Sequence, residues 1–261
     1  MIRRVLLGFA FLLMAAACGG GETTAPTSAP AAQPPAEQPT EPPAQEGYQG
    51  GSVSDGGEIT GKISYNGEAV GPTEVAVDKD NEVCGDTIEV SPVITDGSGG
   101  LRDAVVRITD ISSGRPLSDL GTEFVLDQSG CVYEPNVLIV PVGSSMTVLN
   151  SDGILHNVHT TPFDNAPLNV AQPGTEPEIT SDPFTFPETI PVSCDVHSWM
   201  GAHVVTVDNP YAVLTGPDGS FSLTDVPAGT YSVEIWHPEF GSQSMEVTVE
   251  AGGSATLDAD F

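Results

Sequence analysis

Positive charge is the scarcest property of this sequence. Its 261 residues include 7 Lys and Arg against 36 Asp and Glu, which gives a formal net charge of −29 at pH 7. Only two lysines are present, Lys62 and Lys79. Nucleic acids and anionic membrane surfaces attract positive charge, so this balance argues against both as partners. The carboxylates indicate a solvated acidic surface, although docking of a basic partner is an alternative use for them.

Long apolar runs are also missing, except at the N-terminus. There a short basic head is followed by the run VLLGFAFLLMAAA and then by Cys18. The run is short for a membrane-spanning helix and ends in small residues, which is typical of a secretory signal. Residues 1–18 resemble a bacterial lipoprotein signal, with Cys18 as the lipidated residue, and an ordinary signal peptide cut nearby is the alternative. Lipidation would anchor the protein to a lipid membrane, extracytoplasmic in the periplasm or on the cell surface.

The segment that follows has almost nothing that could build a core. Residues 19–57 consist mainly of Pro, Ala, Gln, Glu, Thr and Gly. Such a composition predicts a disordered, solvated tether that holds a folded part away from the membrane.

Cysteine is rare, with four residues at positions 18, 84, 131 and 194. Export brings them into an oxidising compartment, where free thiols are uncommon unless they have a chemical task. If Cys18 carries lipid, three cysteines remain and one of them is unpaired or acts as a ligand. We predict a disulfide between Cys84 and Cys131, with Cys194 left free. Pairings that use Cys194 stay open at this point.

A sustained helical period is absent after residue 57, and strand signals replace it. Alternating apolar residues with frequent Gly, Pro, Asn and Asp turns predict an all-β sandwich or barrel. The segments with this pattern are 58–65, 103–111, 137–151, 156–161, 203–207, 219–226, 230–236 and 244–251. The predicted core consists of Val105, Ile108, Leu138, Val140, Val148, Val158, Val205, Val207, Val233 and Ile235.

The last fifty residues carry their own pattern. They contain the phrase GPDGSFSLTDVPAGTYSVEIW, in which Asp218–Gly219 and Pro227–Gly229 make turns and Phe221 and Tyr231 face inward. The phrase resembles the transthyretin-like, carboxypeptidase-regulatory-like β modules, which implies a fold and no activity. We predict this module at 210–261 and a larger domain with extra N-terminal strands at 58–209. Fifty residues are few for an independent core, so the module is expected to pack against the larger domain.

A possible metal site lies in the heptapeptide CDVHSWM, which supplies Cys194, His197 and Met200. A fourth candidate ligand, His156, begins a strand after a turn rich in Asn, Ser, Asp and Gly. Zinc sites rarely use Met, and haem attachment would need a second Cys before the His. One thiolate, two imidazoles and a weak thioether suit copper that cycles between Cu(I) and Cu(II).

The segments PVGSSMTVLNSDGILHNVHTT and CDVHSWMGAHVVTV resemble the cupredoxins, the amicyanin type more than the plastocyanin type. The resemblance implies a Greek-key β-sandwich with one type 1 copper site. It assigns His156, Cys194, His197 and Met200 as the metal ligands. Asn157 becomes the residue that ties the ligand strand to the cysteine loop.

The resemblance implies an electron carrier that serves an unidentified redox protein partner, such as a cytochrome or oxidoreductase. The edge of His197 is expected to emerge through an apolar patch that includes Val196 and Trp199. Four protein ligands leave little room for substrate, so we predict no enzymatic activity. The alternatives are a copper storage or trafficking lipoprotein and a non-redox surface-adhesion protein. A second copper site that uses His203 is a further alternative, whereas His159 and His237 are expected to be structural or exposed.

Overall fold

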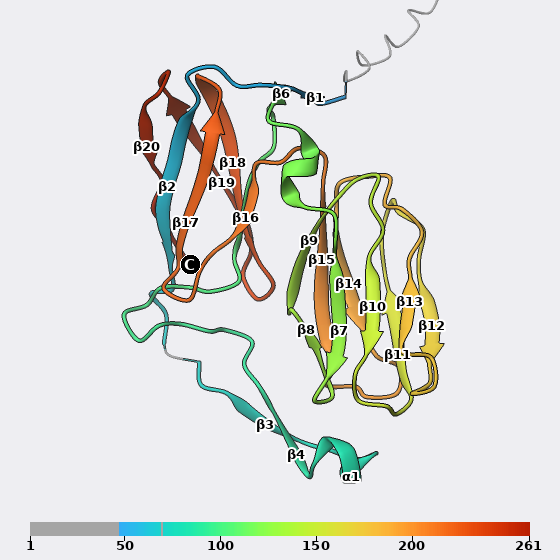
Figure 1. Ribbon diagram of the computed structural model, residues 1–261. Coiled ribbons are helices and arrows are strands. Elements are labelled where there is room, and N and C mark those ends of the chain that lie inside the picture. The colour runs from blue at the N-terminus through green and yellow to red at the C-terminus, as the bar shows by residue number, and fades with distance from the viewer. Residues whose placement is uncertain (1–46, 69) are drawn as a thin grey trace, which may run out of the picture. The chain divides into compact units, whose positions relative to one another are not determined.

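The fold was analysed in a computed structural model that describes residues 47–68 and 70–261 (Figure 1). The predicted signal at 1–18, the lipidated Cys18 and most of the predicted tether lie outside these residues. The prediction of an all-β fold is confirmed, because strands make up nearly all of the regular structure. Among the residues described, no helix is both long and apolar enough to cross a membrane.

The candidate ligands belong to a sandwich of nine strands, β7 to β15, which we call the ligand sandwich. Its two sheets have the strand orders β13-β10-β7-β8 and β12-β11-β14-β15-β9. Two pairings are parallel, β7 with β10 and β9 with β15, and the others are antiparallel. The strands are β7 (Val125–Ser129), β8 (Val132–Glu134), β9 (Val137–Pro141), β10 (Thr147–Asn150), β11 (His156–Thr160), β12 (Asn169–Gln172), β13 (Glu178–Thr180), β14 (Thr189–Ser193) and β15 (Gly201–Val207).

Burial along these strands explains why the sequence forms them. Strand β10 alternates between half-buried and buried residues, as expected for a strand with one face on the core. The second half of β15 is buried on both faces. Val204 belongs to the core of the ligand sandwich, whereas Val205 and Val207 belong to a smaller cluster with Val105 and Ala212. The continuous apolar run HVVTV therefore serves two cores.

A second sandwich, the C-terminal module, contains most of the remaining strands. Its sheets have the orders β16-β5-β18-β19 and β17-β2-β20, with β21 pairing with β2. Its fully buried side chains include Ile59, Leu101, Leu223 and Ile235. The strands are β2 (Gly57–Ser64), β5 (Val105–Ile108), β16 (Ala212–Leu214), β17 (Ser220–Val226), β18 (Gly229–His237), β19 (Gly241–Val249), β20 (Ser254–Thr256) and β21 (Ala259–Asp260).

This strand pairing differs from the predicted boundary between 58–209 and 210–261. Strand β2 lies between β17 and β20, and β5 lies between β16 and β18. Both strands precede the ligand sandwich in sequence yet complete the C-terminal module. The physical reason is size, because the strands after residue 209 are too few to close a core of their own. The alternation of EITGKIS would fit a strand in either sandwich, so the sequence does not show which strands β2 pairs with.

The predicted tether also ends earlier than expected. Strand β1 (Gln49–Gly50) pairs in parallel with β6 (Ser113–Gly114), and the Tyr48 hydroxyl donates a hydrogen bond to the carbonyl of Arg115 at 2.6 Å. Residues 47–57, which we assigned to the tether, are therefore held against the module. A short 3-10 helix, η1 (Leu117–Leu120), leads from there into the ligand sandwich.

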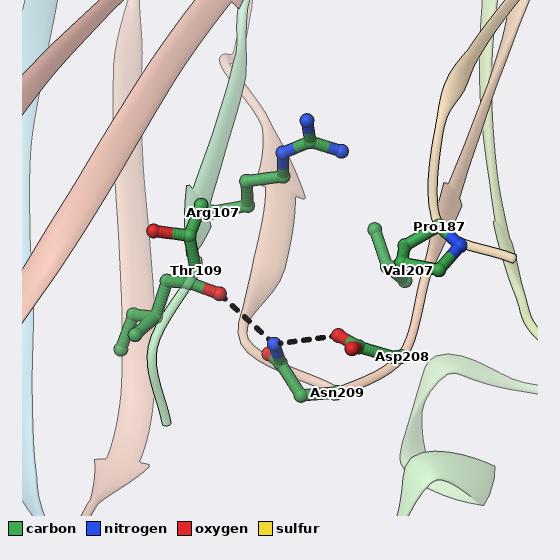
Figure 2. A pocket seen from close by; sticks show the side chains of 7 residues that line it. Arg107, Thr109, Pro187, Val207, Asp208 and Asn209 are labelled. Atoms are coloured by element: carbon green, nitrogen blue, oxygen red, sulfur yellow. Dashed lines mark hydrogen bonds between the residues drawn. The ribbon is translucent and has the colours of Figure 1, made fainter. Parts of the chain in front are cut away.

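The connection between the two sandwiches is held by Asn209. Its side-chain amide donates to the carbonyl of Ile108 at 2.9 Å and to Asp208 Oδ1 at 3.3 Å, beside a small pocket (Figure 2). The Arg107 guanidinium at this pocket lies 2.7 Å from Glu234. These contacts fix the turn from β15 to β16.

One further hairpin lies outside both sandwiches. Strand β3 (Thr73–Ala76) pairs with β4 (Thr87–Val90), and the short helix α1 (Asn81–Cys84) connects them (Figure 1). A disulfide joins Cys84 at the end of α1 to Cys131 between β7 and β8. We call residues 73–90 the cover hairpin.

Candidate metal centre

Three candidate ligands converge at one end of the ligand sandwich. His156 begins β11, Cys194 follows β14, and His197 lies in the turn before β15. The Nδ1 atoms of the two imidazoles are 3.0 Å apart, and the Cys194 Sγ atom is 3.9 Å from Nδ1 of His197. All three donor atoms lie within 4.8 Å of one another. Both imidazoles are fully buried, and Cys194 is 4% exposed.

The far side of each imidazole is fixed by a carboxylate. Nε2 of His156 lies 2.8 Å from Asp152 Oδ2, and Nε2 of His197 lies 2.9 Å from Asp80 Oδ2. A carboxylate accepts hydrogen bonds, so each Nε2 carries the proton and each Nδ1 presents a lone pair. Two lone pairs and a sulfur atom therefore face one another in a buried space. A proton shared between the two Nδ1 atoms would also remove the repulsion between their lone pairs. Burial lowers the pKa of His156, however, and so opposes the uptake of that proton.

These three donors fit a metal ion. Metal–nitrogen and metal–sulfur bonds of about 2.0–2.3 Å place neighbouring donor atoms roughly 3.3–3.8 Å apart. The distances of 3.0 and 3.9 Å bracket that range. Carboxylate-bound imidazoles are also the usual form of metal-binding His, because the second hydrogen bond orients the ring.

The remaining predicted residues lie at the same place. Met200 is 2% exposed and belongs to the same core cluster as Cys194. The ligand loop is tight, because the Met200 N–H donates to the carbonyl of His197 at 3.0 Å and the Cys194 N–H donates to that of Met200 at 3.3 Å. The loop thus holds the thioether residue beside the thiol residue. If the thioether joins the two imidazoles and the thiol as a ligand, the set suits copper better than zinc.

Asn157 connects the ligand strand with the cysteine loop. Its backbone N–H donates to Cys194 Sγ at 3.3 Å, and its side-chain oxygen accepts from the N–H of Asp195 at 3.2 Å. A second N–H, that of His197, donates to the same sulfur at 3.4 Å. Two backbone N–H groups therefore point at the sulfur that would bind a metal.

Sequence reasoning missed three residues at this site. Asp152 was noted only as part of a turn, although its position four residues before His156 is a usable signal. Asp80 precedes His197 by 117 residues, and nothing in the sequence connects them. The Tyr133 hydroxyl lies 2.5 Å from the carbonyl of Asn157 and 3.0 Å from that of Ser193. Burial raises the pKa of Tyr133, so it stays neutral and joins the two ligand-bearing strands.

The prediction that the edge of His197 emerges through an apolar docking patch is wrong. The His197 side chain has no exposed surface, because the cover hairpin places Asp80 on its outer nitrogen. The ring of Trp199 lies 5.0 Å from the ring of His197, and its Nε1 donates to the carbonyl of Cys131. The hairpin arises from residues 73–90, for which the sequence predicted the disulfide to Cys131, now confirmed, but no contact with His197.

The other histidines lie apart from the three donors. His159 is half-buried and lies 3.0 Å from Asp195 Oδ1. The ring of His203 packs edge-on against Trp236 at 5.2 Å, and burial lowers its pKa. Among residues 47–68 and 70–261, His203 belongs to no group of converging metal donors. The structure thus gives no support to the second copper site.

Comparisons with known proteins agree with the two resemblances found in the sequence. Residues 198–261 match the model of the carboxypeptidase regulatory-like domain. This match covers the strands from β15 onward but not β2 and β5, which pair with them. No curated protein matches the chain.

The solved structures that are similar include several copper proteins. A copper-containing nitrite reductase from Thermus scotoductus SA-01 is 17% identical, with 33% of this chain and 23% of that chain covered and a TM-score of 0.30. An oxidised proline-to-glycine mutant of amicyanin is 28% identical, with coverage of 33% and 82% and a TM-score of 0.29. A purple cupredoxin from Nitrosopumilus maritimus is 18% identical, with coverage of 33% and 100% and a TM-score of 0.28. Because these likenesses are partial, we argue the function from the donor atoms themselves.

Proposed function

We propose that the ligand sandwich binds one copper ion as a type 1 site and carries single electrons between redox partners. The observation that carries this proposal is the set of three converging donors, His156, Cys194 and His197, whose electron pairs face one another in a buried space. Copper bound there would supply one-electron exchange between Cu(I) and Cu(II). Met200 would be the weak fourth ligand.

The residues around the donors favour a role in electron transfer over a role in copper delivery. Asp152 and Asp80 fix both imidazoles, and two backbone N–H groups hold the sulfur. A ligand set that cannot rearrange lowers the reorganisation that electron transfer requires. Delivery of copper would instead need ligands that open and exchange, and both imidazoles are fully buried.

The cellular setting is a further part of this proposal. Cys18 as a lipid anchor would place the copper site outside the cytoplasm, on a tether that reaches away from the membrane. The net charge of −29 favours a redox partner with a basic docking surface. We propose a carrier and not an enzyme, since four protein ligands leave no position for substrate.

The test is visible absorption and electron paramagnetic resonance of the copper-loaded protein. We expect an intense thiolate–copper(II) band that is lost in Cys194→Ser and strongly altered in His156→Gln. His159→Gln is the matched control, because it removes an imidazole from the same strand at a residue that contacts Asp195 and none of the donors.

Two results would contradict the proposal. One is a colourless protein that binds zinc and copper alike, with the same behaviour in Cys194→Ser. The other is a coloured protein that readily gives up its copper to a copper-free acceptor protein and whose copper is not reduced by redox proteins. That result would favour copper trafficking.

A further inference from the structure

The outer nitrogen of His197 faces a carboxylate that comes from a distant part of the chain. Asp80 stands at the start of α1 in the cover hairpin, and its Oδ2 lies 2.9 Å from Nε2 of His197. The imidazole is fully buried, whereas the Asp80 side chain is 41% exposed. Asp80 therefore lies between a ligand imidazole and the solvent.

The cover hairpin is attached to the ligand end by contacts of several kinds. The disulfide joins Cys84, four residues after Asp80, to Cys131. The Lys79 ammonium donates to the carbonyl of Val196 at 3.2 Å, next to the ligand loop. An apolar cluster of Val77, Cys84 and Cys131, with Ile88, Ile154 and Trp199 packed around it, lies beneath the hairpin. A covalent bond, a charged hydrogen bond and apolar packing thus all hold Asp80 in place.

The two carboxylates at the site differ in their surroundings. The Asp152 side chain is 7% exposed and also accepts from the N–H groups of Gly130 and Cys131. Its hydrogen-bond partners, Gly130, Cys131 and His156, all lie outside the hairpin. Asp80 instead belongs to the hairpin, so its contact with His197 depends on what holds the hairpin in place.

We propose that Asp80 is a positioning residue for the copper site, and that the cover hairpin is a disulfide-held lid that closes the His197 edge to solvent and chelators. The proposal deepens the proposed function, on which its copper-dependent part rests. Asp80 keeps the proton on Nε2 and thereby keeps the Nδ1 lone pair directed at the other donors. Electron exchange with a partner then occurs through the hairpin or beside it, and not at a bare imidazole edge.

The first experiment uses the copper-free protein, so its result does not depend on the proposed function. Nitrogen-15 NMR of the imidazoles reports which ring nitrogen carries the proton. We expect a single Nε2–H form for His197 in the wild type and a mixture of both tautomers in Asp80→Ala. The Glu82→Gln variant is the matched control, because it removes a negative charge from the same exposed helix and should leave the tautomer unchanged.

The second experiment measures how fast a Cu(I) chelator extracts copper from the loaded protein. Loss of a group that orients a metal-bound His typically costs about 10–100-fold in metal affinity, so we expect faster extraction by a comparable factor in Asp80→Ala and less in Asp80→Asn. The double variant Cys84→Ala/Cys131→Ala should accelerate extraction while it keeps the visible band. Substitution is preferable to reduction here, because a free Cys131 thiol would lie within 4.8 Å of donors on Asp152 and His156 and could bind the metal itself.

The results separate the two proposals. A wild type without the thiolate–copper band but with the tautomer change in Asp80→Ala would refute the electron carrier and leave Asp80 as the residue that orients His197. An Asp80→Ala variant that keeps the Nε2–H tautomer and the wild-type extraction rate would overturn the positioning role. Unchanged extraction in the double cysteine variant would overturn the disulfide-held lid.

Discussion

The two sandwiches bury different kinds of side chain. The core of the C-terminal module is built almost wholly from aliphatic and aromatic residues, with Thr215 and His237 as its buried polar residues and Asn209 buried at the connection. The ligand sandwich buries many more polar groups, which are Gln128, Asn150, His156, Asn157, Thr160, Asn165, Gln172, His197 and Thr206. Buried polar groups need partners, and networks of them fix side chains more precisely than apolar packing does. The comparison indicates that the ligand sandwich fixes particular polar side chains in position, whereas the core of the C-terminal module mainly stabilises its fold.

The two tryptophans allow each region to be followed separately. Trp199 lies in the ligand loop and Trp236 lies on β18 of the module. A Trp236→Phe background therefore reports the ligand sandwich by fluorescence, and a Trp199→Phe background reports the module on the side where Trp236 packs against His203 of β15. The predictions below use both backgrounds, in urea titrations of the copper-free protein unless copper is stated.

The largest effect is expected from removal of the disulfide, which joins the cover hairpin to the ligand sandwich. Cys84 and Cys131 are 47 residues apart, and closing a loop of that length stabilises a protein by about 4 kcal/mol in the chain-entropy model. The double variant Cys84→Ala/Cys131→Ala should shift the Trp199 transition by about 3–4 kcal/mol. A shift of the same size in the Trp236 transition would show that the two sandwiches unfold as one unit and would break the comparison.

A matched pair of core truncations should separate stability from copper binding. Ile190 on β14 and Ile235 on β18 are both fully buried. Replacement of either by Ala should lower the free energy of unfolding by about 3 kcal/mol, since the apolar contacts are lost and a cavity remains. Only Ile190→Ala is expected to speed copper loss, because β14 leads directly to Cys194. Equal copper loss in Ile235→Ala would mean that the module supports the site.

Acid should destabilise the module through His237. This side chain is 2% exposed, its ring stacks on Phe240 at 5.0 Å, and burial lowers its pKa to about 4. In the unfolded chain its pKa is about 6.5, so between pH 6.5 and 4 the unfolded state binds a proton that the folded state does not. The contribution of His237 to stability therefore falls as the pH drops through this window and levels off near pH 4.

The expected loss is about 2–3 kcal/mol, allowing for partial screening of the shift. Urea titrations at a series of pH values with the Trp236 signal would measure it. In His237→Gln the slope between pH 6.5 and 4 should be reduced; a remainder is expected from His203 of β15, which packs against Trp236 and whose pKa burial also lowers. A slope that His237→Gln leaves unchanged would contradict this account.

What the sequence predicted well depends on short-range patterns. The ligand loop CDVHSWM spans seven residues, and HNVH begins a single strand, so spacing alone brings their chemistry together. The strand alternation likewise predicted nine of the ten core residues as buried, with Leu138 only half-buried. The pattern could not show that these residues divide among three clusters, because alternation indicates which face of a strand is buried but not which other strands pack against that face.

What the sequence could not predict depends on contacts between distant segments. Asp80 reaches His197 across 117 residues, and Glu58 of β2 pairs with Ser254 of β20 across 196 residues, with no residue pattern that encodes either pairing. A lone Asp in an acidic sequence is ordinary, so its place on the imidazole became visible only from the fold. The error about the docking patch has the same origin, since it assumed that nothing covered the ligand loop.

The smallest effect is expected from one buried amide of the ligand sandwich, and it tests the comparison most directly. Gln128 Nε2 donates to Gln172 Oε1 at 2.7 Å, and Gln172 Nε2 donates to the carbonyl of Val148 at 3.2 Å, with both side chains fully buried. Gln172→Ala removes this acceptor, so that Gln128 Nε2 keeps only its bond to the carbonyl of Leu149 at 3.1 Å and the Val148 carbonyl loses a donor, which should cost about 2 kcal/mol in the Trp199 transition. Gln243→Ala in the module, where the amide is partly exposed and donates to one carbonyl at 3.3 Å, should change stability by less than about 0.5 kcal/mol. Similar losses for both would mean that buried polar pairing does not distinguish the two sandwiches.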